Sequence, residues 1–273
     1  MPLLKYLLLF SILAFIQSCS SIQMNKDSIE IETKKITYKT GQTEMKGHLS
    51  YPVGDKNKKY PGVIVVHEWW GQNNYSRSRA DLLAKQGYVT LALDMYGQGK
   101  QATHPKDAMK FSKAVFKNID EAKARFMAAL EVLKSQDNVD TEQIGAIGYC
   151  FGGGIVLTMA RMGVDLDAVA SFHGSLSSPI KASKGEFDGD VYIFNGAADP
   201  MVSAQDISNI KEEFKNANID LKFKNYDGAQ HAFTNPEATQ LGKKFGLPLS
   251  YNLAADQDSW SSLLDFFAEE FDK

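Results

Sequence analysis

The sequence predicts an α/β fold in which a mostly parallel central sheet is covered by helices on both faces. Strand and helix patterns alternate along the chain, and the inner strand patterns are apolar throughout, as expected of strands that are buried on both sides. The composition is that of an ordinary globular protein, with 44% hydrophobic and 23% charged residues. The length of 273 residues allows one large core, and we expect a single domain over residues 35–273.

The elements follow one another in a regular order. Alternating patterns over residues 29–38 and 45–51, separated by a turn at Gly41, predict antiparallel edge strands. Apolar runs predict buried strands over 60–67, 88–94, 144–148, 168–174 and 190–196, and a last alternating run predicts a strand over 220–226. Amphipathic or small-residue patterns predict helices over 77–86, 111–135, 153–162, 207–217 and 259–271. Residues 95–105 are a polar, glycine-containing connection.

The first eighteen residues are expected to be a signal peptide. Lys5 supplies a positive charge, and the apolar run over 7–16 is shorter than the about 20 residues that span a bilayer. The segment ending in Ser18 and Cys19 resembles a bacterial lipoprotein signal. The resemblance implies a lipid anchor on Cys19, a tether over residues 19–34 and an exported, membrane-attached lipoprotein of the cell envelope. The alternative is an ordinary secretory signal, which would give a soluble periplasmic or secreted protein.

Cys150 stands at the corner between a predicted strand and a predicted helix. The segment Gly148-Tyr149-Cys150-Phe151-Gly152 has the spacing of a nucleophile elbow, in which the glycines allow a tight turn. The sequence holds two cysteines, and with Cys19 assigned to the anchor Cys150 is the thiol of the folded domain. An unpaired thiol in an exported protein favours a functional role over the alternative, an inert cysteine of the core.

Three further polar residues follow predicted strands, where parallel sheets gather their functional side chains: Glu68, Asp199 and His231. The order of Cys150, Asp199 and His231 along the chain is that of an α/β-hydrolase triad. His231 would accept the thiol proton, Asp199 would orient the imidazole, and the start of the following helix would favour a thiolate. The alternatives are a helix cap for Asp199 and a surface position for His231.

A tetrahedral intermediate needs two hydrogen-bond donors for its oxyanion. In this architecture they are expected to be the backbone N–H groups of Phe151, next to the nucleophile, and of Trp69. Trp70 and Tyr96 are candidates for an aromatic substrate pocket, with core packing as an equal alternative. Two other histidines are interpreted differently: His67 as structural, and His173 as pocket wall or core.

Residues 35–272 resemble the dienelactone hydrolase family, which are thiol-dependent α/β-hydrolases. The resemblance rests on five segments in order, namely His67-Glu68-Trp69-Trp70-Gly71, Asp94-Met95-Tyr96-Gly97, Gly148 to Gly153, Gly196 to Pro200, and Gln230-His231-Ala232-Phe233. It implies the α/β-hydrolase fold and an esterase resembling carboxymethylenebutenolidase. It also implies that Glu68 lies beside the resting Cys150 and takes part in its activation; the alternative for Glu68 is a solvated loop acid.

The sequence departs from this family where an anionic lactone would be bound. Family members that take such a substrate hold its carboxylate with arginines, but neither 97–100 nor 234–236 contains arginine. Lys100 is a candidate substitute. We therefore expect a small ester or lactone substrate and leave the dienelactone itself open.

Other partners have little support in the sequence. The formal net charge of -3 and the scattered lysines argue against nucleic-acid binding. No pair of ligands has metal-site spacing, so we expect no metal and no cofactor, and we expect a monomer. Two other functions stay open: a catalytically silent ligand-binding lipoprotein, and a thioesterase or acyl transferase on the same fold.

Overall fold

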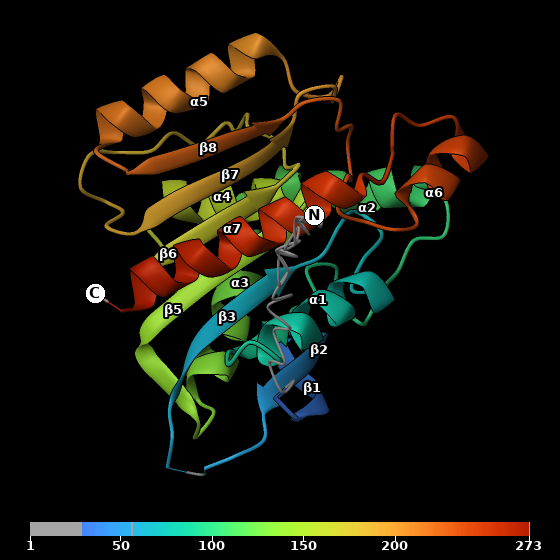
Figure 1. Cartoon of the computed structure of the whole chain (residues 1–273). Coiled ribbons are helices and arrows are strands. Elements are labelled where there is room, and N and C mark those ends of the chain that lie inside the picture. The colour runs from blue at the N-terminus through green and yellow to red at the C-terminus, as the bar shows by residue number, and fades with distance from the viewer. Residues whose placement is uncertain (1–28, 56, 273) are drawn as a thin grey trace, which may run out of the picture.

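The computed structural model describes residues 29–55 and 57–272, which form one eight-stranded sheet with helices around it (Figure 1). The strands are β1 Ile31–Thr40, β2 Thr43–Pro52, β3 Tyr60–Val66, β4 Val89–Ala92, β5 Val139–Tyr149, β6 Ala168–Phe172, β7 Asp190–Gly196 and β8 Leu221–Tyr226. The helices are α1 Asn74–Ala84, α2 Pro105–Lys117, α3 Ile119–Lys134, α4 Phe151–Arg161, α5 Ala204–Ala217, α6 Ala238–Phe245 and α7 Leu253–Phe271.

The strand order is β1-β2-β4-β3-β5-β6-β7-β8. The β1–β2 and β2–β4 pairs are antiparallel, and every pair from β4 to β8 is parallel. The predicted fold class, a mostly parallel sheet with two antiparallel edge strands, is therefore confirmed. The parallel arrangement brings the carboxyl ends of β3, β5 and β7 to one edge of the sheet, where Glu68, Cys150 and Asp199 follow.

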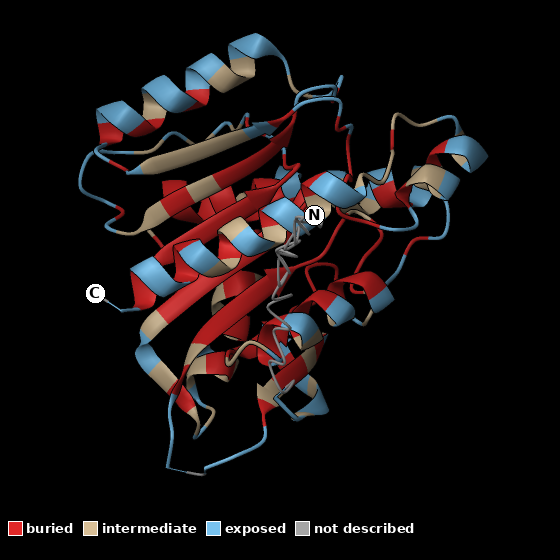
Figure 2. Ribbon diagram, in the orientation of Figure 1, coloured by how far each residue is buried: buried red, intermediate tan, exposed pale blue. Residues whose placement is uncertain are grey.

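Two apolar layers hold the helices against the sheet. In β3, Val63 and Val65 pack with side chains of α1 and α7 on one face, while Ile64 and Val66 pack with α3 and α4 on the other. All four valine and isoleucine side chains are fully buried, and Figure 2 shows the central strands buried and the outer faces of the helices exposed. The continuous apolar run of β3 thus reflects burial on both faces.

One boundary and two helices differ from the prediction. The predicted edge strand is present as β1 and begins at Ile31, whose register partner is Pro52, so residues 31–34, which were also assigned to the tether, lie in the strand. The single helix predicted over 111–135 is two helices, because Asn118 leaves the helical conformation and its side chain caps the next helix. The helix α6 was not predicted.

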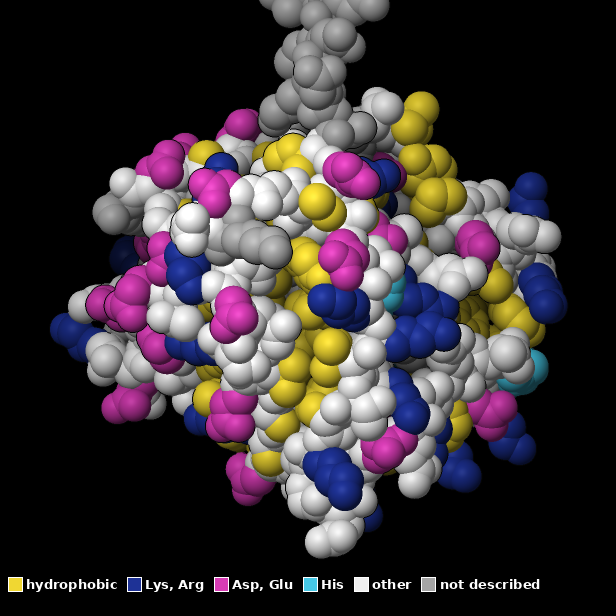
Figure 3. All heavy atoms as spheres, turned by 90° about the horizontal axis from the view of Figure 1, so that it is seen from below, with side chains coloured by type: hydrophobic (Ala, Val, Ile, Leu, Met, Phe, Trp, Pro, Cys, Tyr) yellow, Lys and Arg dark blue, Asp and Glu magenta, His cyan; other side chains and the backbone are white. Residues whose placement is uncertain are grey.

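The predicted signal peptide, the lipidation at Cys19 and most of the tether lie outside the described residues. In the part of the chain that the structure describes, no helix is both long enough and apolar enough to cross a membrane. The face seen in Figure 3 carries basic and acidic side chains intermingled around a strip of hydrophobic ones.

Candidate active site

Cys150 occupies the sharp corner between β5 and α4. Its backbone has φ 54° and ψ -113°, a conformation that L-residues rarely adopt and that is typical of a strained nucleophile turn. A Cβ on Gly148 would lie 2.1 Å from the carbonyl oxygen of Gly152, and a Cβ on Gly152 would lie 2.3 Å from the carbonyl oxygen of Val66. Both contacts are impossible, so the two glycines are required for the corner, and the corner fixes where the thiol stands.

His231 connects the thiol to an acid. Its Nε2 lies 3.0 Å from Cys150 Sγ, and its Nδ1 lies 2.7 Å from Asp199 Oδ2. Asp199 follows β7 and also accepts a hydrogen bond from the N–H of Met201, at 2.8 Å. Asp199 and His231 are 4% and 6% exposed, so these contacts are largely removed from water. The structure therefore brings the three predicted residues into one line with the geometry of a nucleophile, a base and a group that orients the base.

The charges in this line favour a protonated imidazole. Burial alone would lower the pKa of His231, but the negative charge of Cys150 and the hydrogen bond to Asp199 raise it to about 10. At neutral pH an imidazolium beside the sulfur stabilises a thiolate, which is the nucleophilic form of cysteine. The Nδ1–H of His231 donates to the carboxylate of Asp199, and Nε2 of the same ring faces the sulfur of Cys150.

Glu68 is buried directly after β3 and is not the solvated loop acid that the sequence left as an alternative. It is 2% exposed, and its Oε2 accepts a hydrogen bond from Nδ2 of Asn235 at 2.7 Å. Burial raises its pKa to about 7, against the lowering effects of Asn235 and of the charge on His231. Glu68 can therefore exchange a proton near neutral pH.

The two predicted oxyanion donors border the same corner. Phe151 is the first residue of α4, and Trp69 lies in the loop after β3. Within the described part of the chain, neither backbone N–H donates a hydrogen bond to another group. The carbonyl of Trp69 accepts a hydrogen bond from the hydroxyl of Tyr96 at 2.9 Å, which fixes the loop.

Trp70 and Tyr96, predicted to contact substrate, are mostly buried. Trp70 packs in a small cluster with Ala102 and Ala108, and the ring of Tyr96 lies against the ring of Phe151 at a centroid distance of 5.4 Å. Tyr96 also borders a cavity of about 190 Å³ that Lys100 helps to line. Core packing, the alternative for both rings, describes what the structure shows, and direct contact with substrate stays a prediction.

His67 and His173 are buried and hydrogen-bonded. His67 Nε2 accepts the N–H of Met95 at 3.2 Å, in keeping with its structural interpretation. His173, expected to be pocket wall or core, accepts the backbone N–H of Cys150 on its Nδ1 at 3.1 Å. The residues are 23 positions apart, and no local pattern in the sequence announces this contact. The contact between Asn235 and Glu68 was not predicted either. In the sequence, Asn235 was noted only as part of a segment that lacks an arginine.

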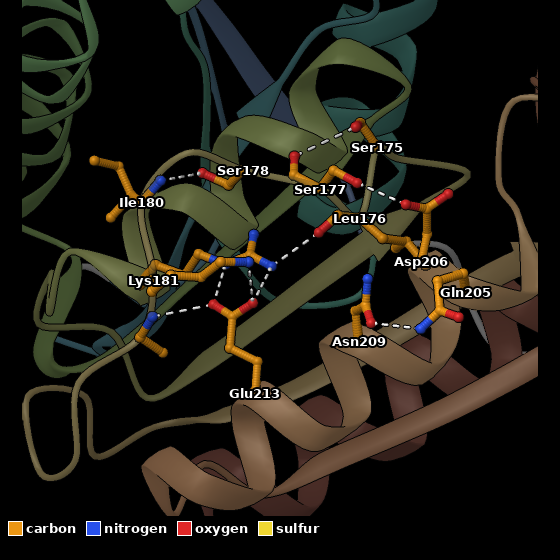
Figure 4. A network of polar contacts seen from close by, with 12 residues as sticks. Ser175, Leu176, Ser177, Ser178, Ile180, Lys181, Gln205, Asp206, Asn209 and Glu213 are labelled. Carbon is orange, nitrogen blue, oxygen red and sulfur yellow. Dashed lines mark hydrogen bonds and ion pairs between the residues drawn. The ribbon is translucent and has the colours of Figure 1, made fainter.

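The loop that begins after His173 is held by a polar network (Figure 4). Glu213 of α5 accepts hydrogen bonds from Arg161 Nε at 2.7 Å, from Lys181 Nζ at 3.2 Å and from the N–H of Ala182 at 3.0 Å. Arg161, at the end of α4, also donates to the carbonyl of Leu176 at 2.8 Å. The network ties the elbow helix, this loop and α5 together, and so holds the segment that follows His173.

Among residues 29–55 and 57–272, no three His, Cys, Asp or Glu side chains group so that they could hold a metal ion.

Comparisons with known proteins identify the family of this chain. The sequence matches the model of the dienelactone hydrolase family over residues 48–271. It is 30% identical to "Protein usf" of Aquifex pyrophilus, over 77% of this chain and 88% of that one. A relative of Synechocystis sp., which carries carboxymethylenebutenolidase in its name, is 26% identical over 89% of this chain and 99% of its own.

Solved structures show the same likeness. A dienelactone hydrolase-like promiscuous phosphotriesterase from metagenomic libraries has a TM-score of 0.82 and 30% identity, covering 88% of this chain and 99% of its own. The structure titled "m3DLH" has a TM-score of 0.83 and 32% identity over the same shares. The predicted α/β-hydrolase fold is thereby confirmed. The predicted enzyme class, a carboxylic ester hydrolase, is confirmed at the level of the family. This chain belongs to the dienelactone hydrolase family.

Proposed function

We propose that this protein hydrolyses a carboxylic ester or lactone through an acyl-enzyme on Cys150. The observation that carries the proposal is the line Cys150–His231–Asp199, with contacts of 3.0 and 2.7 Å. The thiolate of Cys150 attacks the carbonyl carbon, and the negative charge moves to the carbonyl oxygen. The N–H groups of Trp69 and Phe151 are free to bind that oxygen, and one such donor typically contributes about 10² to 10³ in turnover.

The imidazolium of His231 then gives its proton to the leaving alkoxide as the carbon–oxygen bond breaks, which leaves a thioester on Cys150. Water attacks this thioester after giving a proton to the now neutral His231, and the thiolate leaves as the acid product forms. Asp199 keeps the imidazole in the required tautomer throughout. Glu68, whose pKa is about 7, is proposed to accept the thiol proton of any Cys150 that is protonated in the resting enzyme, which gives the thiolate and a neutral glutamic acid.

The substrate is proposed to be neutral. Glu68 is bonded by the uncharged Asn235, and the two segments where a carboxylate-binding arginine was expected contain none. An anionic substrate would therefore meet the buried Glu68 with no arginine in either of these two segments to bind its carboxylate. Lys100 lines a separate cavity beside Tyr96.

We propose that the protein is an exported lipoprotein attached to the membrane through Cys19, which its N-terminal sequence supports. The catalytic domain is proposed to be a monomer. Mass spectrometry of the mature N-terminus tests the attachment, because a lipid on Cys19 distinguishes the anchor from an ordinary cleaved signal.

The substitution Cys150→Ala tests the function. We expect hydrolysis of a small activated ester, such as p-nitrophenyl acetate, to fall to the uncatalysed rate while the far-UV spectrum and melting temperature stay close to those of the parent. Cys19→Ala, which removes the other cysteine, is the matched control and should leave turnover of the purified protein unchanged. Turnover that survives Cys150→Ala would reject the proposal.

The same preparation separates the other functions. A silent binding protein would show no turnover and slow alkylation of Cys150 by iodoacetamide at neutral pH. A burst of product followed by turnover that depends on an added acceptor would indicate an acyl transferase. A p-nitrophenyl phosphotriester belongs in the screen, because a solved relative is titled a phosphotriesterase.

A further inference from the structure

A buried chain of hydrogen bonds joins the backbone of the nucleophile to the loop that carries the base. The N–H of Cys150 donates to Nδ1 of His173 at 3.1 Å, and Nε2 of His173 lies 2.7 Å from Oγ1 of Thr234. Thr234 comes three residues after His231 in the same loop. His173 and Thr234 are fully buried, so water does not compete for these contacts.

The partners of His173 decide which of its nitrogens carries the proton. A backbone N–H can only donate, so Nδ1 must be the unprotonated nitrogen and Nε2 must carry the hydrogen that Thr234 accepts. Burial, and after it the charges of His231 and Arg79, push the pKa of His173 well below its usual value. The ring is thus a neutral spacer with one acceptor and one donor, both used.

Both ends of this spacer are fixed to the scaffold. The N–H of Cys150 also donates to the carbonyl of Phe172 at 3.0 Å, and the backbone of His173 is anchored by its N–H, which donates to the carbonyl of Phe194 at 2.8 Å. At the other end, Arg79 of α1 donates to the carbonyl of Thr234 and, at 2.6 Å, to Asp256 of α7.

The surroundings of the ring leave it little freedom. The rings of His231 and Phe233 lie at centroid distances of 5.4 and 5.2 Å, and that of Tyr149 at 6.0 Å. The hydroxyl of Tyr75 lies 2.6 Å from Oγ1 of Thr234 and completes its hydrogen bonding. The charges that lower the pKa of His173 are those of His231 and Arg79.

We propose that His173 is a positioning residue that, through Thr234, sets the separation between the sulfur of Cys150 and the imidazole of His231. The inference rests on the proposed function, because it concerns the same nucleophile and base. It adds a residue whose ring hydrogen-bonds neither the sulfur of Cys150 nor the imidazole of His231, and which acts by setting the contact between these two groups.

Thr234→Val tests the proposal, since it keeps the shape of the side chain and removes the hydroxyl. The matched control is Thr158→Val, which removes another buried threonine hydroxyl, bonded to the carbonyl of Gly154 at 2.8 Å in the elbow helix. Thr234→Ser keeps the hydroxyl and should restore the parent behaviour. His173→Asn offers an acceptor to the N–H of Cys150 and tolerates the positive φ, but is too short to reach Thr234.

Two measurements on the full chain separate positioning from folding. The first is kcat and KM for p-nitrophenyl acetate; a misplacement of about 1 Å can cost about 10²-fold, so we expect Thr234→Val to lower kcat at least about tenfold with KM nearly unchanged. The second is the pH profile of iodoacetamide alkylation, followed on the peptide that contains Cys150. Its midpoint should rise in Thr234→Val, because a looser contact with His231 stabilises the thiolate less.

The outcomes are distinct. Positioning is supported if Thr234→Val and His173→Asn share both defects, the double variant is no worse than either, and Thr158→Val and Thr234→Ser show neither defect. It is overturned if Thr234→Val keeps the parent kcat and midpoint, or if Thr158→Val loses as much. Should the parent itself lack esterase activity, the proposed function fails, and the alkylation midpoints alone still decide whether His173 and Thr234 position the thiol.

Discussion

Glu68→Gln should make this protein more stable at alkaline pH while reducing its activity. Glutamine has the shape of glutamate, and its amide oxygen can still accept the hydrogen bond that Asn235 donates to Glu68 at 2.7 Å. The substitution therefore removes mainly a buried charge. A gain in stability together with a loss of turnover is typical of a residue kept for function.

The magnitude follows from the pKa. Glu68 has an ordinary pKa of 4.5 in the unfolded chain and about 7 in the buried site, so the folded state holds the proton more tightly. The folded protein is then penalised as Glu68 ionises: the penalty is absent below pH 4.5, grows between pH 4.5 and 7, and is complete above pH 7. The difference between these two pKa values corresponds to about 3 kcal/mol of unfolding free energy. About 2 to 3 kcal/mol of this penalty develops between pH 5 and pH 8.

Urea unfolding of the parent and of Glu68→Gln at pH 5, 6, 7 and 8 measures this difference. We expect the difference in unfolding free energy to move in favour of Glu68→Gln by about 2 to 3 kcal/mol from pH 5 to pH 8. Glu142→Gln, at an exposed glutamate, should give a difference that changes by less than about 0.5 kcal/mol. A difference for Glu68→Gln that stays constant across this range would refute the reasoning.

Three other substitutions test the site and its support. Asp199→Asn should lower kcat by up to about 10⁴-fold with the fold intact, because the amide no longer holds the base in its working tautomer; steady-state kinetics measure this, and full activity would contradict the assignment. Gly152→Ala should prevent the corner from forming, since the new Cβ would lie 2.3 Å from a carbonyl oxygen of β3, and a folded, active product would show that the corner can relax. Glu213→Ala leaves the buried Arg161 without its carboxylate, with the carbonyl of Leu176 still bonded, and should cost about 3 to 5 kcal/mol in urea unfolding; an unchanged midpoint would show that other groups satisfy the guanidinium.

Local patterns were enough to predict the order of the elements and the nucleophile corner. The apolar run of β3 and the glycines around Cys150 have their effect within a few residues, because burial on both faces and steric crowding in a tight turn restrict which residues can occupy them. The break at Asn118 was missed for the opposite reason. Its helical pattern continues on both sides and masked the Asn118–Glu121 spacing of a helix cap, which the structure shows as a hydrogen bond from the N–H of Glu121 to the side chain of Asn118.

The sequence by itself determined the fold class, the corner that carries Cys150, and the order of nucleophile, acid and histidine. Only the tertiary structure decided which side chains share a buried space: Glu68 meets Asn235 across 167 positions, and His173 meets the backbone of Cys150 across 23. The physical reason is that proton affinity depends on burial and on neighbouring charges, which arise when distant segments pack together. The same glutamate would be an ordinary acid on a loop, and packing moves its pKa to about 7, near the pH at which it would have to act.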